Sequence, residues 1–301
     1  MSEADSIESN LWYEETYTNS ERILRKVRRF IISRQTAFQR VDIVDTFLYG
    51  KTLYLDGKLQ SSEKDEFVYH EAIVHPALLT TENRNKILII GGGEGAILRE
   101  VVKYPDVDEI FMVDIDKELV EICKEYLPEW SNGGFQDPRV NLMFEDGRKF
   151  VGEEGDFYDV IIVDLSEPYS TSPSVKLFTK EFYTAVKNRL SQGGVLIVHS
   201  GSTHPEYMGF FRAVYKTLVS VFEIVKPYEI TVPSFTQQWG FVYASRERYP
   251  VRDLRRDMPK SLKFYDLITH QKMFHTTKWF RDSLNKDSPI ITDANPYIWD
   301  F

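Results

Sequence analysis

The sequence predicts an α/β fold, in which a doubly wound and mostly parallel sheet follows a small N-terminal β domain. Short apolar, β-branched runs alternate with helix-compatible segments from Ile87 to about Phe222, the pattern of successive strand and helix units. A glycine-rich stretch follows the first of these runs. Before it, apolar and polar residues alternate as in half-exposed strands. We therefore expect two domains: residues 1–80, which include a connecting helix, and residues 81–301.

The first domain is expected to be mainly strands. Apolar and polar residues alternate between Leu11 and about Leu59, and Asp56-Gly57 provides a turn. The expected strands are residues 30–33, 38–44 and 52–55. From Ser62 to Leu79 the pattern changes: acidic residues precede apolar residues at helical spacing, which predicts a helix that leads into the glycine-rich stretch.

The glycine-rich stretch predicts a nucleoside site. An apolar strand, residues 86–90, runs into Gly91-Gly92-Gly93-Glu94-Gly95 and then into a helical segment. Glycines allow positive φ angles and let a ligand approach the backbone closely, above all at Gly91 and Gly93. The next strand ends at Asp114, about twenty residues on, where a carboxylate can accept hydrogen bonds from ribose. The alternative is a purely structural glycine turn.

The identity of the residues in this turn narrows the class of ligand. The sixth position of the dinucleotide fingerprint is Ala96 instead of glycine, and Glu94 would repel a pyrophosphate. A cationic nucleoside therefore fits the turn better than a dinucleotide.

Three further acidic residues follow predicted strands. Asp146-Gly147 comes after the strand 140–144, where Asp146 can accept from an exocyclic amine or simply form a turn. Asp164 and Glu167 come after the strand 158–163. The later expectations are a loop and candidate lid over residues 169–175, a helix over 177–190, strands at 195–198 and 241–244, and mainly helix over 258–282.

Composition limits the partners and the compartment. With 37 basic and 46 acidic residues, the net charge of −9 argues against a nucleic-acid surface and is compatible with a polycationic substrate. The single cysteine, Cys123, allows no intramolecular disulfide. The first ten residues lack a secretory signal, and no apolar run approaches a membrane span. We therefore expect a soluble, cytoplasmic protein with no membrane partner.

No metal or resident cofactor is expected. His70 and His75 are five residues apart, which is off the helical spacing that metal sites use, and there is no cysteine cluster.

Together the acidic residues fit an alkyl transfer from a sulfonium nucleoside. An amine that attacks a carbon next to S⁺ displaces a neutral thioether. An alkylammonium has a pKa near 10, so removing its proton at pH 7 costs about 4 kcal/mol. A carboxylate base eases this step, and Asp164 is the expected base.

From Leu11 to the end of the chain, the sequence resembles the spermidine synthases, or polyamine aminopropyltransferases. The motifs that carry this resemblance are Phe38-Gln39-Arg40-Val41-Asp42-Ile43, Leu55-Asp56-Gly57-x-x-Gln60, Glu63-Lys64-Asp65-Glu66-Phe67-x-Tyr69-His70-Glu71, Gly91-Gly92-Gly93-Glu94-Gly95 and Leu177-Phe178-Thr179-x-Glu181-Phe182-Tyr183.

The resemblance implies a Rossmann-like sheet of the class I methyltransferase type and a homodimer or homotetramer. It also implies that an aminopropyl group moves from decarboxylated S-adenosylmethionine, as co-substrate, to an amine, releasing methylthioadenosine. Asp164 would accept the proton. The implied donor residues are Gln39, Gly91, Gly93, Asp114, Asp146, Gly147 and Pro173. The residues implied for the aminopropyl group and the acceptor are Trp12, Gln60, Tyr69, His70, Glu94 and Glu167.

The sequence departs from many spermidine synthases at acceptor positions. Glu94 and Glu167 replace Asp, and Val232 replaces a Tyr that precedes a Pro. The stretch from Val232 to Phe235 with Trp239-Gly240 is similar to thermospermine synthases. The pieces Leu127-Pro128-Glu129-Trp130 and Asp293-x-Asn295-Pro296 are similar to agmatine or triamine enzymes of thermophiles.

We therefore expect spermidine, agmatine or another long amine to be preferred over putrescine. The alternatives are a spermidine synthase that uses putrescine, an S-adenosylmethionine-dependent methyltransferase and a non-catalytic polyamine-binding protein.

Overall fold

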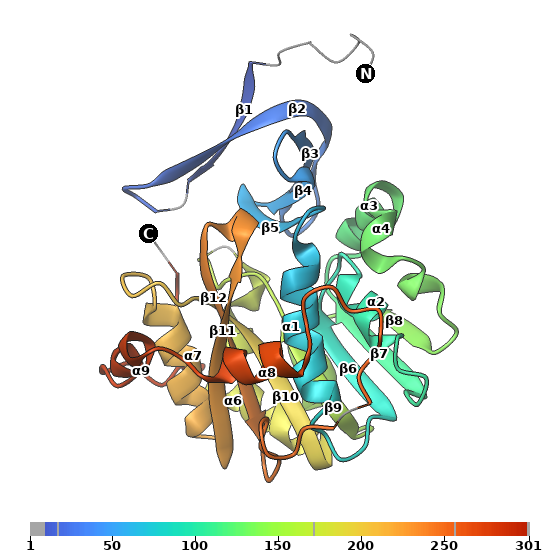
Figure 1. The fold of residues 1–301 in the computed structure, drawn as a ribbon, viewed down its shortest axis with the longest axis vertical. Helices are drawn as coiled ribbons and strands as arrows, with labels where there is room; N and C mark the ends of the chain where they lie inside the picture. Colours follow the sequence, from blue (N-terminus) through green and yellow to red (C-terminus); the bar gives the residue numbers. More distant parts are fainter. Residues whose placement is uncertain (1–9, 17, 171, 256, 300–301) are drawn as a thin grey trace. The chain divides into compact units, whose positions relative to one another are not determined.

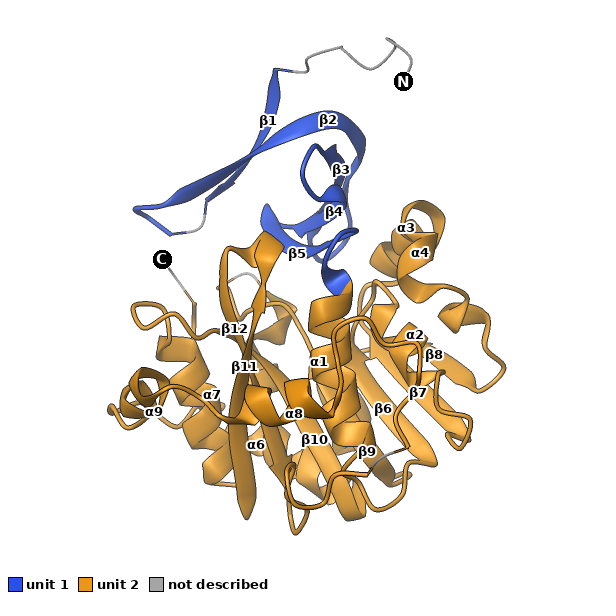
Figure 2. Ribbon diagram, viewed as in Figure 1, with its two compact units in different colours: residues 1–66, 301 blue, residues 67–300 orange. Residues whose placement is uncertain are grey.

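The computed structural model describes residues 10–16, 18–170, 172–255 and 257–299. The chain forms two compact units, which divide between Glu66 and Phe67 (Figure 2). The sequence predicted this boundary at residue 80, which placed the connecting helix α1 (Glu66–Leu78) in the first domain. In the structure nearly all of this helix belongs to the second unit. The two units are described separately below.

The first unit is a five-stranded antiparallel sheet, in the order β1-β2-β3-β4-β5 (Figure 1). The positive φ angles of Asp56 (48°) and Gly57 (77°) form the turn between β4 and β5, as two-residue hairpins require. All three expected strand regions are confirmed. The strands are β1 (Leu11–Thr16), β2 (Arg22–Gln35), β3 (Arg40–Thr46), β4 (Gly50–Leu55) and β5 (Lys58–Ser62).

The second unit contains a seven-stranded sheet in the order β11-β12-β10-β9-β6-β7-β8. Neighbouring strands from β8 to β10 are parallel, whereas β12 is antiparallel to both β10 and β11. The expected doubly wound, mostly parallel sheet is therefore confirmed. The strands are β6 (Lys86–Gly91), β7 (Glu109–Asp114), β8 (Val140–Phe144), β9 (Tyr158–Asp164), β10 (Leu190–Ser202), β11 (Ile224–Val232) and β12 (Gln237–Ser245).

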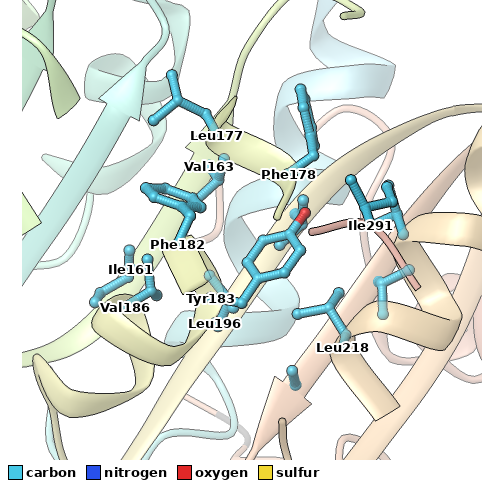
Figure 3. Packing of buried hydrophobic residues seen from close by; sticks show 14 of the residues in the cluster. Ile161, Val163, Leu177, Phe178, Phe182, Tyr183, Val186, Leu196, Leu218 and Ile291 are labelled. Atoms are coloured by element: carbon cyan, nitrogen blue, oxygen red, sulfur yellow. The ribbon is translucent and has the colours of Figure 1, made fainter. Parts of the chain in front are cut away.

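Helices cover this sheet, and their side chains form its core. On one face, Ile161, Val163 and Leu196 pack against Phe182 and Leu218 of two covering helices (Figure 3). The alternate strand residues, which point to the opposite face, are also buried. Burial on both faces explains the continuous apolar runs in the sequence. The helices are α2 (Ala96–Val101), α3 (Lys117–Tyr126), α4 (Pro128–Ser131), α5 (Gly147–Gly152), α6 (Lys180–Asn188), α7 (Gly209–Val219), α8 (Leu267–Phe274) and α9 (Lys278–Leu284), with short 3₁₀ segments η1 (Gly134–Gln136), η2 (Pro173–Phe178) and η3 (Pro233–Phe235).

The helix expected over residues 177–190 is divided in the structure. The 3₁₀ segment η2 ends at Phe178, and α6 begins at Lys180. Thr179 separates them because its hydroxyl accepts the backbone N–H of Phe182 at 3.3 Å, which makes it the N-cap of α6.

The expectation of mainly helix over residues 258–282 was wrong for its first part. Helix α8 begins only at Leu267. The carboxylate of Glu71, on α1, accepts the backbone N–H groups of Lys263, Phe264 and Tyr265, each at 2.8 Å. These amides are satisfied by a side chain instead of by helical carbonyls, so the segment is held in an irregular conformation.

No helix within the described ranges is both long and apolar enough to cross a bilayer. Most of the N-terminal stretch on which the absence of a secretory signal was argued, residues 1–9, lies outside those ranges.

Candidate active site

The glycine turn at the end of β6 lies directly beside the end of β9. Gly91 is opposite Asp164 in the strand register, and the backbone N–H of Gly92 donates to the Asp164 carbonyl at 3.0 Å. Gly91 has a φ of 84°, and a Cβ there would lie 2.0 Å from that carbonyl oxygen. Only glycine fits. The turn and Asp164 are therefore brought together, as the sequence predicted.

Asp114 lies at the end of β7, next to the same turn. Its carboxylate is buried and accepts the backbone N–H of Asp116 at 2.8 Å. A Cβ on Gly93 would lie 2.8 Å from this carboxylate. Burial raises the pKa of Asp114 from 3.8 to about 6, with a further contribution from the negative charges of Asp116 and Asp164. This carboxylate can accept hydrogen bonds from a ligand placed over the turn.

Asp146 and Gly147 follow β8 and form the start of helix α5. Asp146 is exposed and caps α5, because its carboxylate accepts the backbone N–H of Arg148 at 2.8 Å. A Cβ on Gly147 would lie 2.5 Å from the side chain of Ile90, so glycine allows α5 to begin close to β6. Pro173 is the first residue of η2. The expected lid loop, residues 169–175, includes Thr171, which lies outside the described residues.

Asp164 is the centre of a cluster of side chains at the carboxyl ends of β6 and β9, which we call the acidic crevice: Tyr69, His70, Glu94, Asp164 and Glu167. The Tyr69 hydroxyl donates to its Oδ1 at 2.5 Å. Burial raises the pKa of Asp164, although the imidazoles of His199 and His70 and the tyrosine hydrogen bond oppose this shift. The carboxylate of Glu94 raises this pKa further. A carboxyl group of raised pKa is a stronger proton acceptor than an ordinary aspartate.

Two more carboxylates contribute to the crevice. Glu94 lies in the glycine turn, and its Oε1 is 2.6 Å from Nε2 of the buried His70 on α1. Glu167 is buried three residues beyond Asp164, with its Oε1 at 3.8 Å from Nε2 of His199. Both carboxylates, together with Asp164, raise the pKa of Tyr69 beyond the effect of burial. The described residues therefore bring Tyr69, His70, Glu94, Asp164 and Glu167 together.

Sequence reasoning missed His199. Its Nδ1 is 2.8 Å from the Leu165 carbonyl, and its ring stacks on Trp239 with centroids 5.6 Å apart and planes at 9°. Burial lowers the pKa of this imidazole, although the Asp164 carboxylate and the Leu165 carbonyl oppose the shift. Its Nε2 is buried without a hydrogen-bond partner in the described structure. The expected strand ended at Val198, one residue earlier, so the rule that polar residues follow strand ends could have found it.

Aromatic residues after β11 were also missed as parts of this crevice. The rings of Phe235 and Trp239 are 4.8 Å apart, and Phe235 lies 6.1 Å from Tyr69. They come from η3 and β12, which are distant in sequence from α1, and only the sheet topology brings them to it.

Trp12, Gln39 and Gln60 belong to the first unit, so their roles stay predictions. Trp12 is exposed on β1, opposite Lys26 of β2. Gln39 is half-buried and precedes β3. Gln60 is half-buried on β5, where its side-chain amide donates to the Lys58 carbonyl at 3.2 Å.

A pocket and the arrangement of possible metal ligands bear on whether a second site exists. A pocket of about 820 Å³ lies between α7, β11 and the segment after β12, and none of the crevice residues lines it. In the part of the chain that the structure describes, no group of three or more His, Cys, Asp and Glu side chains is arranged to hold a metal ion. The expectation that no cofactor is needed stays a prediction.

Family comparisons agree with this geometry. Residues 66–254 match the family model described as the spermine/spermidine synthase domain. Residues 11–63 match the model described as the spermidine synthase tetramerisation domain.

Known relatives and solved structures extend the match to nearly the whole chain. Polyamine aminopropyltransferases from Sulfurisphaera tokodaii and Sulfolobus acidocaldarius are 41% and 40% identical, over 95% of this chain and 97% of each relative. A spermidine synthase crystallised with the transition-state analogue AdoDATO superposes with a TM-score of 0.87, at 32% identity, over 91% of this chain and 95% of that one. The spermidine synthase of Thermotoga maritima gives 0.85, at 32% identity, over 91% and 94%. The chain therefore belongs to the spermine/spermidine synthase family, the aminopropyltransferase enzymes of polyamine biosynthesis.

Proposed function

We propose that this enzyme transfers an aminopropyl group from decarboxylated S-adenosylmethionine to an extended amine, with Asp164 as the proton acceptor. The observation that carries the proposal is the set of three carboxylates, Asp164, Glu94 and Glu167, beside the glycine turn. Such a crevice attracts a sulfonium and an amine and repels a donor that retains its carboxylate. The names of the relatives and the analogue in the solved structure support the same reaction class.

The donor residues are assigned by position around the turn. In this proposal Asp114 accepts the ribose hydroxyls and Asp146 accepts the exocyclic amine of adenine. Gly91, Gly93 and Gly147 allow close approach of the nucleoside. Pro173 completes these donor residues as the family resemblance implies, and the donor role of Gln39, a residue of the first unit, stays a prediction.

The chemical step is a displacement at carbon. The lone pair of the acceptor amine forms a C–N bond with the carbon next to S⁺. The C–S bond breaks, and its electron pair stays on sulfur to give neutral methylthioadenosine. The amine proton passes to Asp164, whose raised pKa favours its acceptance. The Tyr69 hydroxyl holds the Asp164 carboxylate in place for this transfer.

The residues near Val232 support a preference for a longer acceptor. This residue is buried at the end of β11, and valine supplies neither the ring nor the hydroxyl of the family's tyrosine. Phe235 and Trp239 contribute rings at this edge of the crevice, so the aromatic surface remains while the hydroxyl donor is lost. A longer acceptor brings additional ammonium groups to the same carboxylates, and this supports spermidine, agmatine or a similar amine over putrescine.

The test is an acceptor panel with one donor. Putrescine, cadaverine, agmatine, norspermidine and spermidine are assayed separately, and products are identified by mass. We expect an extended amine to exceed putrescine in kcat/KM by at least about tenfold, or 1.4 kcal/mol of transition-state binding. If putrescine is best, the enzyme is a spermidine synthase in the narrow sense, and the interpretation of Val232 is wrong.

We also infer a homo-oligomer, a dimer or a tetramer. The inference is supported by the match of residues 11–63 to the tetramerisation model.

A further inference from the structure

Residues 291–299 of the second unit form a segment without regular helix. Hydrogen bonds connect this segment to α6 and to the loop that follows Glu167. The backbone N–H of Lys180 donates to the Ile291 carbonyl at 2.8 Å. The Asp293 N–H donates to the Glu181 carboxylate at 3.0 Å, and the Trp299 N–H donates to the Pro168 carbonyl at 2.9 Å. Pro168 directly follows Glu167, so the segment reaches the loop that carries a crevice carboxylate.

Arg148 connects this segment to the start of α5. Its backbone N–H donates to the Asp146 carboxylate at 2.8 Å. Its guanidinium donates to Oδ1 of Asp293 at 2.8 Å and, through Nη2, to Oδ2 of the same carboxylate. The same guanidinium donates to the Lys176 carbonyl of η2 at 2.8 Å. One side chain therefore joins three pieces of chain: α5, η2 and residues 291–299.

The chemistry of the pair favours a fixed geometry. A forked, charge-assisted contact sets both the distance and the orientation of a guanidinium. Hydrogen bonds from Arg148 lower the pKa of Asp293, which keeps this carboxylate ionised at neutral pH. The two side chains are 31% and 36% exposed, so the pair by itself adds little to global stability.

We infer that Arg148 and Asp293 form a positioning pair for the donor nucleoside. The inference rests on the proposed donor roles of Asp146, Gly147 and Pro173. Asp146 and Gly147 begin α5, Pro173 begins η2, and the Arg148 guanidinium sets the spacing between these two elements. Asp293 holds that guanidinium in its forked orientation without itself being assigned to the donor.

The experiment measures methylthioadenosine binding to the whole enzyme by calorimetry. We expect Asp293→Asn to raise the dissociation constant about fivefold, because the loss of a charge-assisted fork loosens the spacing. Arg148→Lys should give a similar loss, since lysine keeps the charge but not the fork. In steady-state assays the donor KM should rise in both variants while the acceptor KM stays unchanged.

The matched control is Glu223→Gln, which breaks the ion pair between Lys187 and Glu223 (2.7 Å) in the same unit. This variant should lose a similar small amount of thermal stability and bind methylthioadenosine like the wild type. Wild-type affinity in Asp293→Asn, or equal losses of affinity in Asp293→Asn and Glu223→Gln, would overturn the positioning role. Failure of the wild type to bind methylthioadenosine would instead overturn the donor assignment, and the positioning role with it.

Discussion

Two histidines of helix α1 each pair with a glutamate outside that helix, and the two pairs have the same chemistry in different surroundings. His70 Nε2 lies 2.6 Å from Glu94, and the glutamate, 11% exposed, belongs to the glycine turn of the crevice. His75 Nε2 lies 3.1 Å from Glu100, and both side chains are almost fully buried, at 0% and 1%. The two histidines are five residues apart on one helix.

The pairs differ in how their charge is compensated. Glu100 also accepts hydrogen bonds from Lys103 at 2.6 Å and Arg99 at 2.9 Å. Burial alone would raise its pKa, but the contacts with His75 and these two cations outweigh burial and hold the pKa well below its usual range. In the crevice the charge balance is the opposite, because Glu94 raises the pKa of the neighbouring Asp164. A histidine–glutamate pair is structural where cations balance it, and it points to function where negative charge is in excess.

The largest expected effect comes from breaking the core pair. Glu100→Gln should lower the free energy of unfolding by about 3 kcal/mol, because the half-buried cations Lys103 and Arg99 lose their buried anionic partner. Denaturant unfolding monitored by circular dichroism measures this loss. The kcat/KM of the folded fraction should stay unchanged, because among the described residues Glu100 pairs with His75, Arg99 and Lys103, to which no role in the reaction is assigned.

The same substitution in the crevice pair sharpens the comparison. Glu94→Gln should change stability by no more than about 0.5 kcal/mol while lowering kcat/KM for the acceptor about tenfold. Equal losses of stability in the two variants would mean that the surrounding charge does not separate the two pairs.

An effect almost as large as that of the core pair comes from Asp164, the carboxylate whose pKa Glu94 raises. Asp164→Asn should lower turnover at least about 100-fold, or 2.7 kcal/mol, as expected when a general base is removed. Methylthioadenosine binding, measured by calorimetry, should persist. Turnover near that of the wild type would remove Asp164 from the mechanism.

The smallest effect concerns pH. The pKa of Asp114 is raised to about 6, and the proposed ribose contact requires its ionised form. Methylthioadenosine affinity should therefore be constant above pH 7 and fall as the pH drops through 6, about tenfold per unit at most. Calorimetry between pH 5 and 8 measures it, and Asp114→Asn should abolish the dependence.

The effect of the same group on stability has the opposite sign. Because the folded-state pKa of Asp114 lies above its usual 3.8, protonation favours the folded state. Its contribution to stability is present below pH 3.8 and is lost as the pH rises through 6. A parallel loss of stability and affinity on acidification would contradict this assignment to Asp114.

Much of the fold could be predicted because buried parallel strands leave a clear pattern. The runs around Ile89 and Ile162 are apolar on both faces of the sheet; glycines follow the first run, and Asp164 ends the second. The edge strand β11 was missed because Lys226 and Pro227 interrupt its apolar run. The order of the strands also required the structure, since periodicity does not encode which strands are neighbours.

The residues of the candidate site differ in the same way: local sequence patterns marked some of them, and only the structure revealed the others. Asp164, Glu94 and Tyr69 lie in motifs near strand ends or on the helix before the turn, so sequence alone marked them. Trp239 reaches the crevice only because β12 pairs antiparallel with β10, a long-range pairing that local patterns do not contain. His199 lies on β10 itself, one residue beyond the end of the expected strand.

The contact of Glu71 with residues 263–265 has a consequence for how the sequence can vary. One carboxylate recognises three backbone amides there and none of their side chains. Many residue types could therefore replace Lys263 or Phe264 without loss of this contact. Proline is the exception, because it has no N–H to donate. Glutamate itself is far less replaceable, since its amide analogue would bring an NH₂ group to a position where only acceptors are useful.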